Sequence, residues 1–160
     1  FVEPEFETYN IDPKRIEDAI TERTKAIIVV HLYGVVADMG PILEIAKKHN
    51  LKVVEDCAQC FGGEYNGKKA GTIGDVGCFS FCQSKHFTTG GEGGMVVTNN
   101  EEVGWECRSF RDHGYDVKAR MNMLAGLSDL VDIQIRLIPA DNLFNCYLSR
   151  KSIDIQSLEL

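Results

Sequence analysis

Lys85 comes at the end of an apolar stretch, "GCFSFCQSK", which raises the question of what a lysine does beside a buried strand. Lysine is rarely buried, because stripping water from an ammonium group is costly. Two other apolar runs also end in polar residues. "VVED" ends in Asp56, with Gln59 one turn later, and "IIVVH" ends in His31. Since ligands of open α/β sheets bind at the carboxyl ends of strands, these positions predict a site.

A lysine and an aspartate at neighbouring strand ends suit the chemistry of pyridoxal phosphate (PLP). Its aldehyde forms a Schiff base with an amine such as Lys85, and its ring nitrogen needs a carboxylate such as Asp56. The Ser80 hydroxyl could bind the phosphate, and the Gln59 amide could serve the ring hydroxyl. The pattern alone also fits purely structural roles, in which Asp56 and Gln59 cap a helix and Lys85 reaches solvent.

Alternating strands and helices position these residues. The run 25–31 is continuously apolar and β-branched, as expected for a strand buried on both faces. An Asn-Gly pair within 64–71 predicts a surface hairpin. The other expected elements are helices at 12–20, 38–50 and 101–114, and strands at 51–56, 76–81 and 94–99. This alternation indicates an α/β layer structure with a largely parallel sheet.

Five short motifs occur in order along the chain: "VHLYG", "ED-x-AQ", "G-x-x-GD-x-G-CFSF", "SK" and "GGEGG-x-VVTN". Through them the sequence resembles, over roughly residues 8 to 120, the DegT/DnrJ/EryC1/StrS family of PLP-dependent sugar aminotransferases. The resemblance implies part of the large domain of PLP-dependent transferase fold type I (aspartate aminotransferase-like), a three-layer α/β fold with a mostly parallel sheet.

The resemblance also implies roles for single residues. Lys85 would be the Schiff-base lysine and would shuttle the proton of the 1,3-proton transfer. Asp56 would pair with the pyridinium nitrogen, Gln59 would bind the ring hydroxyl, and Ser80 would bind the phosphate. The implied enzyme is a cytoplasmic homodimer of nucleotide-sugar biosynthesis, supplying cell-surface polysaccharide or antibiotic sugars. It would pass an amino group from glutamate or glutamine to a keto-sugar nucleotide or a keto-cyclitol.

The resemblance covers only part of the family's active site. The upstream phosphate loop, the ring-stacking aromatic residue and the downstream "G-x-N-x-R-M" segment are not found, so we expect a segment of a longer protein. Residues 1–120 would be part of the PLP-binding large domain, and 121–160 an atypical tail without a recognised motif. A truncated, non-catalytic family member is the alternative, and alone the segment is expected to be poorly soluble and inactive.

A sugar dehydratase and a zinc module are two further alternatives. Dehydratases of the family replace the lysine with histidine, whereas here Lys85 is present and His86 merely follows it. The pairs in "CAQC" and "CFSFC" have a separation that suits zinc. The intervening residues, however, match the aminotransferase motifs, so these cysteines are interpreted as small buried hydrophobes, and His31 as a core histidine.

The charge and the apolar runs of the chain argue against two classes of binding partner, nucleic acids and membranes. A formal net charge of −7 argues against nucleic acid, whose phosphates require clustered Lys and Arg. The longest apolar runs are too short to span a bilayer, so no membrane partner is expected. The acidic start "FVEPEFETYN" lacks the features of a signal peptide, and the six cysteines are therefore expected to be reduced thiols of a cytosolic protein.

Overall fold

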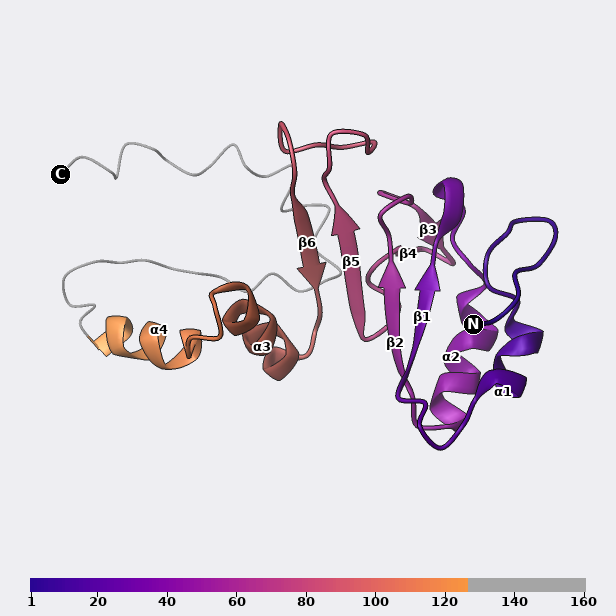
Figure 1. Cartoon of the computed structure of the whole chain (residues 1–160), viewed down its shortest axis with the longest axis horizontal. Coiled ribbons are helices and arrows are strands. Elements are labelled where there is room, and N and C mark those ends of the chain that lie inside the picture. The colour runs from indigo at the N-terminus through magenta and orange to yellow at the C-terminus, as the bar shows by residue number, and fades with distance from the viewer. Residues whose placement is uncertain (127–160) are drawn as a thin grey trace.

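The computed structural model describes residues 1–126 as a mixed α/β structure (Figure 1). Its elements, in chain order, are η1 (Pro13–Arg15), α1 (Ile16–Ala19), β1 (Ala26–Val30), η2 (Leu32–Gly34), α2 (Met39–Lys48), β2 (Lys52–Asp56), β3 (Glu64–Tyr65), β4 (Lys68–Lys69), β5 (Val76–Ser80), β6 (Gly94–Val97), α3 (Glu101–Arg111) and α4 (Val117–Gly126). None of the helices in this part of the chain is long and apolar enough to cross a membrane.

The main sheet has the strand order β1-β2-β5-β6. β1, β2 and β5 run parallel, and β6 runs antiparallel to β5, which confirms the predicted, mostly parallel sheet. The three parallel strands therefore end at the same edge, at the top of Figure 1. In the register, Val30 pairs with Asp56 and Asp56 pairs with Cys78.

Local sequence explains where the helices begin. Asp12 caps η1 by accepting a hydrogen bond from the backbone N–H of Lys14, and Pro13 occupies the first position, as predicted. Asp38 precedes α2 but does not cap it directly. Instead, the Tyr65 hydroxyl donates to Asp38 (2.6 Å) and accepts from the backbone N–H of Gly40 (3.1 Å). The β3–β4 hairpin is thereby joined to the start of α2.

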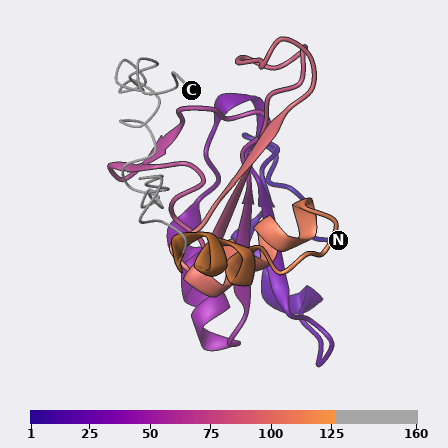
Figure 2. The same ribbon diagram turned by 90° about the vertical axis from the view of Figure 1, so that its left-hand side faces the viewer.

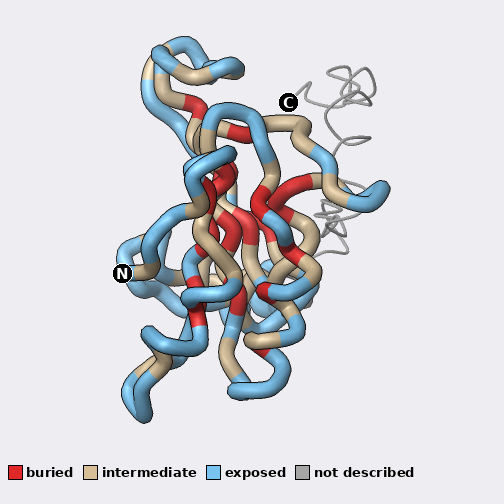
Figure 3. The backbone as a smooth tube through the Cα atoms, turned by 90° about the vertical axis from the view of Figure 1, so that its right-hand side faces the viewer, coloured by how far each residue is buried: buried red, intermediate tan, exposed pale blue. Residues whose placement is uncertain are grey.

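One face of the sheet carries the larger core. Ile27 and Val29 of β1 and Val53 of β2 are buried there against the apolar face of α2 and against Ile16 of α1. A second cluster under β5 and β6 contains Phe79, Phe81 and Val97 with Cys57, Cys60 and Ala70. Buried residues accordingly gather in the interior, in the strands, in α2 and in the adjoining parts of the loops, and exposed residues lie at the periphery (Figure 3).

The opposite face of the sheet is open within residues 1–126. Ile28 is 64% exposed, Val30 37% and Val96 49%. The expectation that β1 is buried on both faces is therefore not met in the described structure, because α1 and α2 cover only one of them. α3 and α4 lie beyond β6, at the other end of the sheet from α1 and α2 (Figure 1, Figure 2).

The predicted hairpin is confirmed, since β3 and β4 pair antiparallel around Asn66 and Gly67. Both residues have positive φ, 49° and 79°, as a two-residue type I′ connection requires.

The predicted helix at 12–20 is divided into η1 and the single turn of α1. Predicted and observed bounds of the long helices and the strands otherwise differ by three residues at most.

Helix α4 is absent from the sequence-based predictions. It begins at Val117 and crosses residue 120, where the sequence pattern weakens. Its apolar residues follow no helical stripe, which is why the sequence did not indicate it. The domain boundary at 120 stays a prediction, and most of the expected tail at 121–160 lies outside the described residues.

The glycines of "GTIGDVG" allow backbone to pack on backbone. A Cβ at Gly77 would overlap the backbone of Gly71, and a Cβ at Gly74 would lie 2.8 Å from the carbonyl oxygen of Val53. Both contacts involve main chain, which cannot move aside as a side chain can. The segment between β4 and β5 therefore depends on these glycines for its close approach to the sheet.

We expect Gly77→Ala to lower the free energy of unfolding by about 1–3 kcal/mol, because overpacking forces backbone shifts. Gly104→Ala is the matched control: it adds the same methyl group within α3, where the nearest neighbour is the flexible end of the Arg108 side chain at 3.3 Å. The control should be neutral or stabilising, since alanine favours helix over glycine. Urea denaturation of the wild type and both variants measures the free energy of unfolding. If Gly77→Ala had the same denaturation midpoint as Gly104→Ala, the close packing of Gly77 on Gly71 would not limit the side chain at this position.

Candidate active site

Asp56 and Ser80 lie on the open face of the sheet, at its carboxyl edge. Asp56 ends β2 and Ser80 ends β5. Asp56 pairs with Cys78, and Ser80 lies two residues further along the same strand, so the side chains share one face. Both residues are half-buried. The structure therefore brings together two of the four predicted site residues.

Gln59 and Lys85 follow in the loops at the same edge. Gln59 lies three residues beyond β2, and its Oε1 accepts a hydrogen bond from the backbone N–H of Tyr33 at 3.3 Å. Lys85 lies in the 81–93 loop between β5 and β6, where its backbone N–H donates to Cys82. The half-buried Lys85 side chain forms no hydrogen bond or ion pair with residues 1–126, and no such contact joins it to Asp56, Gln59 or Ser80.

Asp56 and Ser80 also make local contacts. Asp56 Oδ1 accepts from the backbone N–H of Ala58 at 3.0 Å, and Ser80 Oγ accepts from Cys82 N–H at 3.4 Å. These are local turn contacts. The structural alternative, in which Asp56 and Gln59 cap a helix, is not met, because turns and not a helix follow β2. Each of the two contacts uses only part of the hydrogen-bonding capacity, because the second carboxylate oxygen of Asp56 and the hydroxyl proton of Ser80 remain for a ligand.

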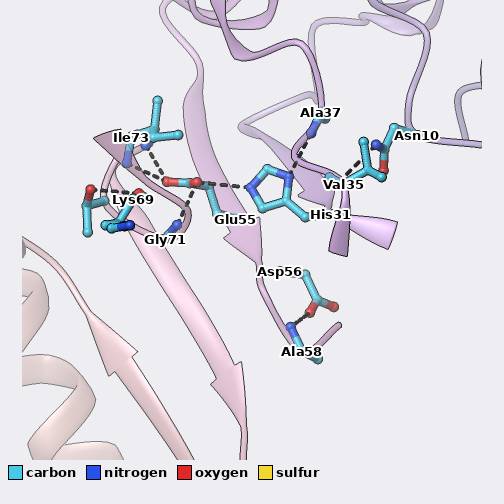
Figure 4. Close-up of polar contacts among 12 residues, drawn as sticks. Asn10, His31, Val35, Ala37, Glu55, Asp56, Ala58, Lys69, Gly71 and Ile73 are labelled. Carbon is cyan, nitrogen blue, oxygen red and sulfur yellow. Dashed lines mark hydrogen bonds and ion pairs between the residues drawn. The ribbon is translucent and has the colours of Figure 1, made fainter. Parts of the chain in front are cut away.

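Glu55, next to Asp56, is completely buried and was not predicted from the sequence. Its carboxylate accepts hydrogen bonds from the backbone N–H groups of Gly71 (2.8 Å), Ile73 (2.7 Å) and Gly74 (2.6 Å). A fourth contact, at 3.0 Å, joins it to His31 Nε2 (Figure 4). Burial acts to raise the pKa of Glu55, but the hydrogen bonds from His31 and the loop outweigh it and hold that pKa below its ordinary value.

His31 is the buried core histidine that the sequence analysis expected, with a side-chain exposure of 0%. Its Nδ1 accepts from the backbone N–H of Ala37 at 3.2 Å. Because a backbone N–H can only donate, the proton of the neutral ring lies on Nε2, which donates to Glu55. The pair is therefore a neutral histidine bonded to an ionised carboxylate (Figure 4).

Cys57, Cys60, Cys78 and Cys82, the cysteines of the zinc alternative, do not converge into a metal-binding cluster within residues 1–126. Within residues 1–126, the metal-ligating side chains that converge are His31, Glu55 and Cys57, all within 4.8 Å of one another. Both His31 nitrogens are already engaged in hydrogen bonds, and burial raises the pKa of the Cys57 thiol well above its ordinary value. A protonated thiol is a poor metal ligand, so this cluster works as a hydrogen-bonded core.

Comparison with known proteins identifies the chain. Residues 1–136 match the DegT/DnrJ/EryC1/StrS aminotransferase family. The chain belongs to this family. The dTDP-3-amino-3,6-dideoxy-alpha-D-galactopyranose transaminase of Aneurinibacillus thermoaerophilus is 49% identical over 131 residues, which are 82% of this chain and 36% of that protein. The resemblance stated from the sequence motifs is thereby confirmed.

Solved structures agree on the fold. The aminotransferase from Psychrobacter cryohalolentis superposes with a TM-score of 0.72 at 40% identity, covering 88% of this chain and 34% of that one. NtdA from Bacillus subtilis, solved with the cofactor PMP bound, gives a TM-score of 0.67 at 35% identity, with coverages of 87% and 28%. The chain thus has part of the predicted aminotransferase fold, and spans about a third of the length of the relatives that it matches.

We expect Glu55→Gln to cost about 3 kcal/mol of stability, because the amide NH₂ would face a backbone N–H donor in a buried position. Since folding lowers the pKa of Glu55, its contribution is complete above the ordinary value of 4.5 and is lost as the pH falls through the lower folded-state pKa. The stability difference between wild type and variant should therefore be constant from pH 7 to about 5 and shrink in stronger acid.

Glu64→Gln is the matched control for this measurement. Glu64 is 49% exposed and pairs with Lys69 at the surface, at 2.7 Å. Such pairs contribute less than about 1 kcal/mol, so this variant should unfold close to the wild type at every pH. If Glu55→Gln also unfolded like the wild type at pH 7, the four buried contacts would not be holding the strand ends.

Proposed function

We propose that the full-length protein containing this chain is a PLP-dependent aminotransferase of nucleotide-sugar biosynthesis. It takes an amino group from glutamate or glutamine and passes it to a keto-sugar nucleotide. The observation that carries the proposal is the placement of Asp56 and Ser80 on one sheet face, beside the loop of Lys85, in a member of an aminotransferase family. The transaminase name of the Aneurinibacillus relative supports the class of acceptor.

The donor set at the carboxyl edge fits PLP. The second carboxylate oxygen of Asp56 can hold the protonated ring nitrogen, the Gln59 NH₂ can donate to the ring oxygen, and the Ser80 hydroxyl can bind the phosphate. Lys85 carries the amine that would bond to the aldehyde, and once that amine is free its Nζ would accept the proton that leaves the α-carbon of the bound amino donor. When bound, the cofactor supplies an electron sink for the carbon that loses this proton.

The chain alone is proposed to be inactive, and the complete protein to be a cytoplasmic homodimer. Ile28 and Val30, on the face that carries Asp56, remain exposed, so residues 1–126 do not keep water from a bound cofactor. The family resemblance implies that further segments and a second subunit complete the site. The five cysteines within residues 1–126 are free thiols, which suits a reducing compartment.

Lys85→Ala should abolish covalent attachment of PLP in the full-length protein, because no other amine occupies the Lys85 position. Borohydride reduction followed by mass spectrometry of the peptides measures the attachment. Lys47→Ala, at an exposed position of α2, is the matched control and should keep the wild-type adduct. An adduct of undiminished yield in the Lys85 variant would refute the assignment.

Asp56→Asn should leave PLP binding measurable and lower the rate of transamination by about 10²–10³-fold, as expected when one electrostatic contact to the reacting system is lost. The asparagine can still accept from Ala58 N–H, so the local turn survives. Asp18→Asn, on exposed α1, is the matched control. Release of 2-oxoglutarate from glutamate measures the rate, and near wild-type turnover would reduce Asp56 to a structural cap.

A further inference from the structure

The turn that follows β1 has an unusual conformation, held from both sides by Asn10. Tyr33 has φ 53° and ψ 29°, and Gly34 has φ 83°, so two consecutive residues are left-handed. A non-glycine residue adopts this region only when its surroundings compensate for the strain. The Tyr33 side chain is 76% exposed, so its packing does not explain the conformation.

Asn10 supplies that compensation. It is 1% exposed, and its Oδ1 accepts from the backbone N–H of Leu32 at 2.9 Å. Its Nδ2 donates to the carbonyl oxygen of Val35 at 3.1 Å, so one buried amide clamps both ends of the turn. His31 holds the segment beyond by accepting from Ala37 N–H. The side chains of Asn10 and His31 therefore hold the turn and the residues that follow it in place.

The clamped turn presents the backbone N–H of Tyr33 to Gln59. Because a backbone N–H can only donate, the oxygen of the Gln59 amide must face it, as the 3.3 Å contact shows. The other end of the amide, the NH₂ group, is then the end left to face a ligand. The orientation of Gln59 is therefore decided by the turn, and not by Gln59 alone.

We propose that Asn10 is a positioning residue for Gln59: by clamping the Leu32–Val35 turn, it directs the NH₂ of Gln59 toward the ligand as a hydrogen-bond donor. This inference rests on the proposed function, in which the acceptor is the ring oxygen of PLP. That oxygen can only accept once it is ionised, so an amide turned the other way would place two acceptors together and weaken binding.

Amide hydrogen exchange of Tyr33 in the cofactor-free, full-length protein tests the turn without relying on activity. Asn10→Asp keeps the acceptor for Leu32 but sets a second acceptor against Val35, and Gln59→Ala removes the acceptor for Tyr33. Both should speed exchange of Tyr33 by about 5–10-fold, the equivalent of one ordinary hydrogen bond. Gln59→Glu keeps an acceptor, so its Tyr33 amide should exchange at the wild-type rate.

PLP affinity, followed by the cofactor's absorbance, tests the orientation. Gln59→Glu and Asn10→Asp should both bind PLP about 5–10-fold more weakly than the wild type, since each loses the directed donor. Asn66→Asp is the matched control, because it makes the same change in the β3–β4 turn, where Asp-Gly is as suitable as Asn-Gly. It should alter neither measurement.

Unchanged Tyr33 exchange in Gln59→Ala would overturn the inference, and so would wild-type PLP affinity in Gln59→Glu. Wild-type Tyr33 exchange and PLP affinity in a folded Asn10 variant would overturn it as well. If Asn10→Asp fails to fold, Asn10→Ala, which removes both turn contacts without adding a charge, takes its place in both measurements. A wild-type protein that bound no PLP would instead refute the proposed function, while the exchange measurement would still decide by itself whether Asn10 and Gln59 hold the turn.

Discussion

The buried carboxylate of Glu55 is the constraint on which the sheet edge depends. A charge without access to water is tolerated only when hydrogen bonds replace its hydration, and Glu55 has four of them. Three come from the Gly71–Gly74 loop and one from His31 at the end of β1. One side chain therefore sets the spacing of β1, β2 and the chain entering β5, and a shift of any partner would leave a buried donor or acceptor unpaired.

Because side chains alternate along a strand, the structural residue Glu55 and the candidate ligand-binding residue Asp56 lie on opposite faces of the sheet. Glu55 points into the core, so Asp56, the next residue of β2, must point to the opposite face. Fixing Glu55 fixes the direction of Asp56 without any contact to Asp56 itself. The doublet "ED" thus combines a side chain that holds the edge together with one that faces a ligand. The glycines of the adjoining loop serve the same arrangement, because they let its N–H groups approach Glu55.

Much of the fold could be predicted because its signals are local. The apolar runs gave β1, β2 and β5, and Asn66-Gly67 gave the hairpin. The positions of Asp56 and Ser80 on one edge followed from the parallel order of the strands. Glu55 and Asn10 escaped prediction because their roles are long-range. Glu55 meets loop groups 16 to 19 residues away, and Asn10 meets residues 22 and 25 positions further on.

The open sheet face explains why the expected burial of β1 on both faces is not met within residues 1–126. "AIIVV" is apolar at every position, as suits a strand covered on both sides, yet β1 alternates between buried and exposed residues within 1–126. The chain spans about a third of the length of its relatives. The exposed apolar residues of β1 therefore indicate a face that other segments would cover and that residues 1–126 leave open. Asp56 and Ser80 lie on this same face. Whatever covers Ile28 and Val30 would therefore also enclose the candidate site, so closing the core and excluding water from the chemistry would be one event.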